Sequence, residues 1–227
     1  MKLASLFSGG KDSCYSLLKA KQQGHEIVCL ISIISENKES YMFHFPNIHL
    51  VKEQAEALEL PIILKQTKGK KELELDDLKE AIKQAIKKFN IEGIVCGALA
   101  SEYQRSRVQK ICDELNIKMI APLWHTDIEQ YMHDLIKDNF KIIISGIGAE
   151  GLSEQDLGKV IDKDFIEKTK KTQIHLGAEG GEYETTVLDC PLFRKRIEIL
   201  DAEKQMDSEY SGVYKIKKVK LVEKTNH

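Results

Sequence analysis

Short apolar runs alternate with amphipathic segments along the first half of the chain. Five runs are long enough for one buried strand each, and they lie at residues 3–7, 26–35, 61–66, 93–97 and 118–121. Between them, apolar residues recur at the spacing of a helix that buries one face, from Cys14 onward and at residues 47–58, 72–89 and 101–115. Buried strands that alternate with helices are typical of a parallel sheet covered on both faces. We therefore predict a doubly wound α/β domain at residues 1–124.

After Trp124 the pattern changes. The spacing predicts a helix, a strand, a charged helical segment and two long β-rich runs, at residues 127–137, 140–145, 153–172, 185–200 and 212–223. Because this order is not a regular strand–helix alternation, we expect a second, smaller α+β domain at residues 125–227.

Composition narrows the classes of protein that fit. The chain has 227 residues, 42% of them hydrophobic, and a formal net charge of −2. The charge predicts no general attraction for nucleic acid or membranes, and no apolar run approaches the roughly 18 residues of a membrane span. The first residues enter a strand without a signal-peptide profile, so we expect a cytoplasmic protein. The five cysteines form no C-x-x-C pair and are expected to be buried free thiols.

The first predicted strand ends in a segment suited to phosphate. Residues 8–13, called the phosphate loop below, read Ser-Gly-Gly-Lys-Asp-Ser and lead directly into a helix. Two glycines allow positive φ and close backbone approach, and a helix N-terminus adds partial positive charge. The polar members supply two hydroxyls, a cation, and a carboxylate that could cap the helix or bind Mg²⁺; they are Ser8, Ser13, Lys11 and Asp12.

The phosphate loop is not a Walker A motif, because that pattern requires Gly at position 5 and Ser or Thr at position 12. The chain has Ser5 and Asp12 instead. The six residues resemble the PP-loop of the ATP pyrophosphatase superfamily. The resemblance implies an adenine nucleotide alpha hydrolase-like fold and cleavage of ATP between its α- and β-phosphates, with adenylation of a substrate oxygen.

Three further stretches could contribute to a functional site, and each also has a purely structural interpretation. Gly97 follows a predicted strand, Ser101 could cap the next helix, and Arg105 and Arg107 could bind phosphate or carboxylate or could simply pack on the surface. His44, after the second predicted strand, is either a contact to nucleotide or substrate or a structural histidine. The G-x-G-x-x-G match at residues 146–151 is interpreted as a turn between a strand and a helix, not as a dinucleotide site.

Residues 177–187, called the acidic segment below, combine glycines with three carboxylates around one aromatic, Tyr183. If the segment is extended, Glu182 and Glu184 share a face, and two such like charges need a cation between them. Mg²⁺, an ammonium ion or a basic side chain could be that cation. The alternative is a solvated acidic hairpin.

These stretches, together with Ser-Tyr-Met-Phe at residues 40–43, resemble the diphthine–ammonia ligase family, also called diphthamide synthetases. The match covers nearly the whole chain, and Glu-Gly-Gly-Glu-Tyr-Glu-Thr at residues 179–185 is its most specific part. It implies the last step of diphthamide synthesis on translation elongation factor two. There, ATP and ammonium convert the carboxylate of diphthine to an amide and release AMP and pyrophosphate.

The resemblance also implies roles for individual residues. ATP would contact Ser8, Gly9, Gly10, Lys11, Asp12, Ser13, Ser35, His44 and Gly97, with Mg²⁺ on Asp12. Catalysis would depend on Asp12, Lys11, Glu182 and Glu184. The substrate would contact Tyr103, Arg105, Arg107, Glu179, Tyr183 and Thr185, and the aromatics could hold the quaternary ammonium of diphthine by cation–π attraction.

Two alternatives stay open at this point. One is a different PP-loop ligase, such as a tRNA-modifying thiolase or an amidotransferase. A thiolase would require paired cysteines and an amidotransferase a glutaminase domain with a nucleophilic cysteine, whereas position 2 is Lys. Free ammonium is therefore the expected nitrogen source. The other alternative is a non-catalytic ATP-binding sensor, which would leave the acidic segment without a purpose. No direct nucleic-acid binding is expected, and homo-oligomerisation is left open.

Overall fold

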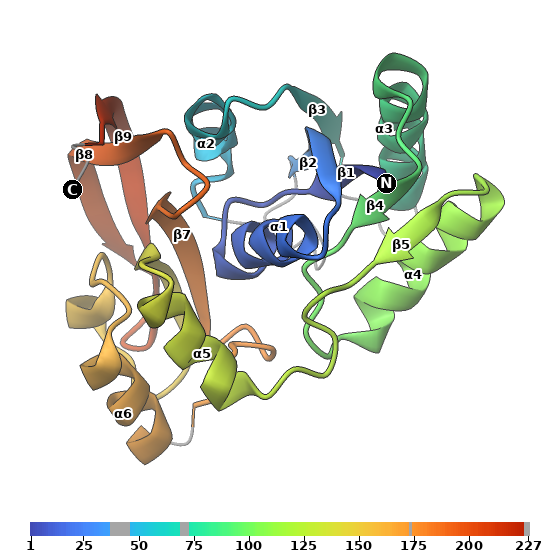
Figure 1. Cartoon of the computed structure of the whole chain (residues 1–227). Helices are drawn as coiled ribbons and strands as arrows, with labels where there is room; N and C mark the ends of the chain where they lie inside the picture. Colours follow the sequence, from blue (N-terminus) through green and yellow to red (C-terminus); the bar gives the residue numbers. More distant parts are fainter. Residues whose placement is uncertain (37–45, 69–72, 173, 225–227) are drawn as a thin grey trace.

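A computed structural model describes residues 1–36, 46–68, 73–172 and 174–224 (Figure 1). The first half forms a five-stranded sheet in the order β3-β2-β1-β4-β5 in which every pair is parallel. The strands are β1 (Lys2–Leu6), β2 (Glu26–Ser35), β3 (Ile62–Thr67), β4 (Gly93–Val95) and β5 (Lys118–Ile120). The doubly wound α/β prediction is confirmed.

Helices cover both faces of this sheet because successive strand residues point to opposite sides. Leu3 of β1 packs with the helices on one face, and Ala4 packs with those on the other. The first pair is α1 (Lys11–Gln22) and α2 (Val51–Leu58), which follows a 3₁₀ turn at Ile48–Leu50; the second pair is α3 (Leu73–Phe89) and α4 (Glu102–Glu114). The strand order reverses between β1 and β4, and ligands of such sheets bind at that point, beyond the carboxyl ends of the strands.

The second half forms a four-stranded antiparallel sheet in the order β7-β6-β9-β8. Its strands are β6 (Lys141–Gly148), β7 (Tyr183–Asp189), β8 (Lys195–Met206) and β9 (Ser211–Glu223), and its helices are α5 (Ile128–Lys137), a 3₁₀ turn at Glu154–Asp156, and α6 (Lys163–Thr172). This sheet with its helices confirms the α+β prediction. Its core is continuous with the one under α1 and α2, so α1 lies between the two sheets (Figure 1).

One expectation for the second half holds and one was wrong. Residues 185–200 are β-rich, as expected, and are divided between two strands because Pro191 lies in the turn between β7 and β8. The turn expected at residues 146–151 begins only after β6. Gly146 and Gly148 lie inside β6, opposite Val213 and Ser211 of β9, and only Gly151 occupies the turn after it. A Cβ at Gly146 would come within 3.2 Å of the Glu184 Cβ, so close strand approach explains that glycine.

Other expectations hold. Ser101 caps α4 by accepting a hydrogen bond from the Gln104 backbone. All five cysteines are buried and free. In the part of the chain that the structure describes, no helix has the length and apolar character needed to cross a membrane.

Candidate active site

The phosphate loop joins the carboxyl end of β1 to the first turn of α1, as the sequence predicts. Gly10 is the N-cap, and its N–H donates to Ser8 Oγ at 3.4 Å. The Ser13 hydroxyl donates back to the Gly10 carbonyl at 3.0 Å. Gly9 has φ +78°, a conformation that favours glycine. The turn and the helix N-terminus together form the kind of site that attracts phosphate.

Gln54, a buried residue of α2, clamps this loop from outside. Its Nε2 donates to the Gly9 carbonyl at 2.9 Å and to the Val187 carbonyl at 2.8 Å. The Val187 N–H of β7 donates to the same Gly9 carbonyl at 3.0 Å. The phosphate loop is therefore fixed between α2 and the second sheet. Gln54 is not among the predicted site residues, because its only local signal is a polar side chain on the buried face of a helix.

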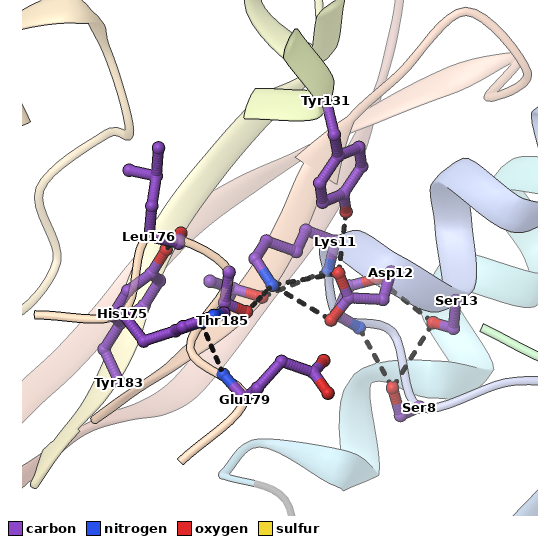
Figure 2. Close-up of polar contacts among 12 residues, drawn as sticks. Ser8, Lys11, Asp12, Ser13, Tyr131, His175, Leu176, Glu179, Tyr183 and Thr185 are labelled. Atoms are coloured by element: carbon purple, nitrogen blue, oxygen red, sulfur yellow. Dashed lines mark hydrogen bonds and ion pairs between the residues drawn. The ribbon is translucent and has the colours of Figure 1, made fainter. Parts of the chain in front are cut away.

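Lys11 and Asp12 form the charged centre of the site (Figure 2). The Lys11 side chain is 2% exposed, and its ammonium donates to both Asp12 carboxylate oxygens, at 2.9 and 3.0 Å, and to the Gly177 carbonyl at 2.8 Å. The rings of Tyr131 and Tyr183 each lie 5.9 Å from the ammonium. All three N–H donors are used, as a buried cation requires, so Lys11 joins α1 to the acidic segment.

Tyr131 reaches the same carboxylate from α5. Its hydroxyl donates to Asp12 Oδ1 at 2.7 Å, and its side chain is buried. Burial and the adjacent Asp12 carboxylate raise the pKa of Tyr131 well above its usual value, so the hydroxyl keeps its proton and acts as a donor. Sequence reasoning missed Tyr131, because an aromatic on the buried face of an amphipathic helix is usually a core residue.

The acidic segment folds against the phosphate loop. The Lys11 backbone N–H donates to Thr185 Oγ1 at 3.1 Å, and a Cβ on Gly10 would come within 3.2 Å of the Thr185 carbonyl. The Tyr183 hydroxyl donates to the Leu176 carbonyl, which holds the preceding loop (Figure 2). Stretches more than 160 residues apart in sequence thus form one site.

The three carboxylates of the acidic segment have different surroundings. The Glu179 side chain extends toward Asp12 (Figure 2); burial and the Asp12 charge raise its pKa, while Lys11 lowers it. Burial raises the pKa of Glu184 to about 7, with Lys11 lowering it and Asp12 raising it. The Glu182 carboxylate accepts from the Gly180 N–H at 2.9 Å and so closes its own turn. The charges of Lys11 and Asp12 therefore act on both Glu179 and Glu184, whereas the Glu182 carboxylate is held within its own turn.

The described part of the chain provides one carboxylate that could be a ligand of Mg²⁺, but no complete set of metal ligands. Among residues 1–36, 46–68, 73–172 and 174–224, no group of three or more His, Cys, Asp or Glu side chains could hold a metal ion. Mg²⁺ in phosphate-transferring enzymes is commonly held by one or two carboxylates together with substrate phosphates. The partly exposed Asp12 carboxylate, within the phosphate loop, fits that requirement.

The other predicted nucleotide contacts are Gly97, Ser35 and His44, and the structure describes the first two. A Cβ on Gly97 would come within 3.0 Å of the Asp12 and Ser13 backbone, so the first turn of α1 packs directly on this glycine. Ser35 is the last residue of β2. His44 and residues 40–43 lie outside the described residues, and so their predicted contacts are not addressed by the structure.

The two arginines of α4 stack on aromatic rings. The Arg105 guanidinium lies 4.8 Å from the Trp124 ring centroid and 3.4 Å from a Glu102 oxygen. The Arg107 guanidinium lies 3.5 Å from the Tyr103 ring centroid. These contacts account for the positions of both arginines, and a role toward substrate stays a prediction.

A pH-dependent stability is expected from Glu184. Since the folded state raises its pKa from 4.5 to about 7, folding favours the protonated form, and this contribution is lost as pH rises through that interval. Without nucleotide, the free energy of unfolding of the wild type relative to Glu184→Gln should fall by about 2 kcal/mol between pH 5 and pH 8. Urea unfolding at both pH values measures it. Parallel pH profiles for the two proteins would contradict the assignment.

Comparisons with known proteins agree with the site. A family model described as the diphthamide synthase N-terminal domain matches residues 1–119, and one described as the diphthamide synthase C-terminal domain matches residues 127–222. The chain is 36% identical to a mouse diphthine–ammonia ligase, over 92% of this chain and 86% of that protein. It is 37% identical to a cattle protein of the same name, over 89% and 84%.

A solved structure also resembles this chain. It is described as a predicted subunit of tRNA methyltransferase from Methanocaldococcus jannaschii DSM, with 19% identity and a TM-score of 0.45 over 84% of this chain and 98% of that one. The strand order and the parallel pairing of the first sheet support the fold class by themselves.

Proposed function

The chain belongs to the diphthamide synthase family, and from this premise we propose that it is a diphthine–ammonia ligase. It uses ATP and ammonium to convert the carboxylate of diphthine on translation elongation factor two into the amide of diphthamide, with release of AMP and pyrophosphate. The observation that carries the proposal is the junction between the phosphate loop and the acidic segment, made by Lys11 with Thr185 and Gly177. It brings a nucleotide-type loop and a set of carboxylates to one place.

The reaction needs activation because oxide is a poor leaving group from a carboxylate. A carboxylate oxygen of diphthine attacks the α-phosphorus of ATP, the bond between the α- and β-phosphates breaks, and pyrophosphate leaves. Ammonia then attacks the acyl carbon, and the bond from that carbon to the oxygen of AMP breaks. The amide keeps one carboxylate oxygen, and AMP carries the other. Both steps require the enzyme to hold the reacting atoms close together and in the orientation needed for attack.

The phosphate loop supplies the first half of this chemistry. The residues assigned to the phosphates of ATP are Ser8, Gly9, Gly10, Lys11, Asp12 and Ser13. Ser35 and Gly97 are assigned to the nucleoside, and His44 to a phosphate or the substrate. The fixed loop and the N-terminus of α1 need no reorganisation when phosphate charge shifts in the transition state. Asp12 would be the residue that holds Mg²⁺, which would supply charge neutralisation and Lewis-acid chemistry toward phosphate oxygens.

The acidic segment supplies the second half. Glu184, whose pKa is about 7, is suited to accept a proton as ammonium becomes the nucleophile, and Glu179 adds negative charge that attracts the cation. Glu182 supports the turn that carries Glu179. Residues 1–124 form the ATP-binding part, and residues 125–227 form the substrate side with Tyr183 and Thr185; Tyr103, Arg105 and Arg107 extend that side onto α4.

Turnover with purified components tests this function. The protein is incubated with ATP, ammonium and elongation factor two bearing diphthine, and AMP and the amide are quantified. We expect equal amounts of both, and no product when any component is left out or when the factor carries unmodified histidine. ATP that binds without turnover would support a sensor, and AMP formation that depends on tRNA would support another PP-loop ligase. Either result contradicts the proposal.

A further inference from the structure

Tyr131 is the contact that α5 makes with the phosphate-loop carboxylate. Its hydroxyl lies 2.7 Å from Asp12 Oδ1, and its side chain is 2% exposed. The ring packs against Tyr15 of α1, with centroids 5.3 Å apart. Because packing fixes the ring, the position of the hydroxyl is fixed as well, and the hydrogen bond is preorganised.

The acceptor positions of Asp12 show what this bond does. An ionised carboxylate has about four lone-pair positions, two on each oxygen. Oδ1 accepts from the Lys11 ammonium and from the Tyr131 hydroxyl, so both of its positions are used. Oδ2 accepts from Lys11 at 3.0 Å, and among the described residues it has no second donor. The one position left for a cation is therefore on Oδ2.

We propose that Tyr131 is a positioning residue that orients the Asp12 carboxylate so that Oδ2 faces the Mg²⁺ and phosphates of bound ATP. This inference rests on the proposed function, since it assumes that Asp12 meets Mg²⁺ and ATP. The Lys11 ammonium, bound to both oxygens, only keeps the Asp12 carboxylate turned toward Lys11. The added bond from Tyr131 to one oxygen fixes the carboxylate plane, and with it the direction of the free lone pair.

Tyr15 provides a matched control. It is a tyrosine with a 1% exposed side chain, it packs on the same ring, and its hydroxyl donates to Asp138 Oδ2 at 3.0 Å. Tyr15→Phe therefore removes a comparable carboxylate hydrogen bond in the same aromatic cluster, but one that does not involve Asp12. Any loss that comes from weakening the cluster itself should occur in both variants.

The test measures ATP binding by calorimetry, so it does not depend on catalysis. Tyr131→Phe should raise the Kd for ATP with Mg²⁺ about tenfold, because it removes a hydrogen bond to a charged group. Without Mg²⁺, in EDTA, the Kd of Tyr131→Phe for ATP should stay within about twofold of the wild-type Kd. A change of that size is no larger than the usual deviation from additivity between independent mutations. Tyr15→Phe should bind as the wild type under both conditions, with a thermal midpoint similar to that of Tyr131→Phe.

A second comparison asks whether Tyr131 acts through Asp12. In the Asp12→Asn background, Tyr131→Phe should change the Kd for ATP with Mg²⁺ by less than about twofold, since coupled residues are not additive. Wild-type affinity in Tyr131→Phe, or an equal loss in Tyr15→Phe, would overturn the inference and leave the proposed function intact. A wild-type protein that binds no ATP would overturn both.

Discussion

Asp12→Asn is expected to lower the rate of AMP formation by about 100- to 1000-fold, the size of effect seen when one preorganised electrostatic contact to a transition state is lost. The substitution keeps the shape of the side chain but removes its charge. It thus removes the carboxylate that faces the nucleotide phosphates while leaving the phosphate loop in position. The measurement is AMP release at saturating ATP, ammonium and protein substrate.

The same substitution should also weaken the fold. The Lys11 ammonium is 2% exposed, and Asp12 is its partner charge. Removing one member of a buried pair leaves an uncompensated charge, and the partial exposure of Asp12 reduces the loss to about 2–3 kcal/mol of unfolding free energy. A drop in activity alone would therefore not separate a catalytic role from a structural one.

The double variant Lys11→Met, Asp12→Asn separates these roles. It removes both charges and keeps comparable volume, so its unfolding free energy should recover toward the wild type. AMP formation should not recover, because both charged side chains assigned to the nucleotide, Lys11 and Asp12, are missing. If the double variant regains turnover, the two charges serve only to compensate each other, and the assignment of Asp12 and Lys11 to the nucleotide is wrong.

Gly9→Ala is expected to abolish ATP binding and to lower the unfolding free energy by about 3 kcal/mol or more. Gly9 has φ +78°, and a Cβ at this position would lie 2.0 Å from Gln54 Oε1. Gln54 cannot move aside freely, because its Nε2 holds the Gly9 and Val187 carbonyls. The added methyl must therefore displace the phosphate loop or break these hydrogen bonds.

Gly24→Ala is the matched control for this prediction. Gly24 has φ +82°, close to that of Gly9, but nothing lies within 4 Å of its added Cβ. The unfolding free energy of Gly24→Ala should fall only by the cost of a left-handed backbone conformation at alanine, about 1–2 kcal/mol. This variant should bind ATP as the wild type does. Chemical unfolding and calorimetry on both variants give the comparison. Equal losses of stability with retained ATP binding in Gly9→Ala would show that Gln54 does not clamp the loop.

The features that depend on local sequence were predictable. The parallel sheet could be predicted because its central strands, β1, β2 and β4, are largely buried and read as mostly apolar runs. The phosphate loop could be predicted because its six residues are contiguous and follow a strand. The cap on α4 and the buried cysteines also follow from residue type and spacing.

The features that depend on long-range packing were not. Tyr131 and Gln54 read as buried helix positions, and nothing in their local sequence indicates that they touch Asp12 and Gly9. The glycines of β6 looked like a turn because glycine usually marks one, whereas Gly146 meets a close strand contact. Alternation alone also suggested a shared role for Glu182 and Glu184, but the bend before β7 directs the Glu182 carboxylate to Gly180.

Oxygen-isotope transfer tests the central claim most directly. The claim is that the phosphate loop holds ATP so that a carboxylate oxygen attacks the α-phosphorus. The enzyme is given ATP, ammonium and elongation factor two whose diphthine carboxylate is labelled with oxygen-18, and the nucleotide product is analysed by mass spectrometry. The account predicts AMP that carries one labelled oxygen for each amide formed. Unlabelled AMP, or ADP with the label in inorganic phosphate, would contradict it.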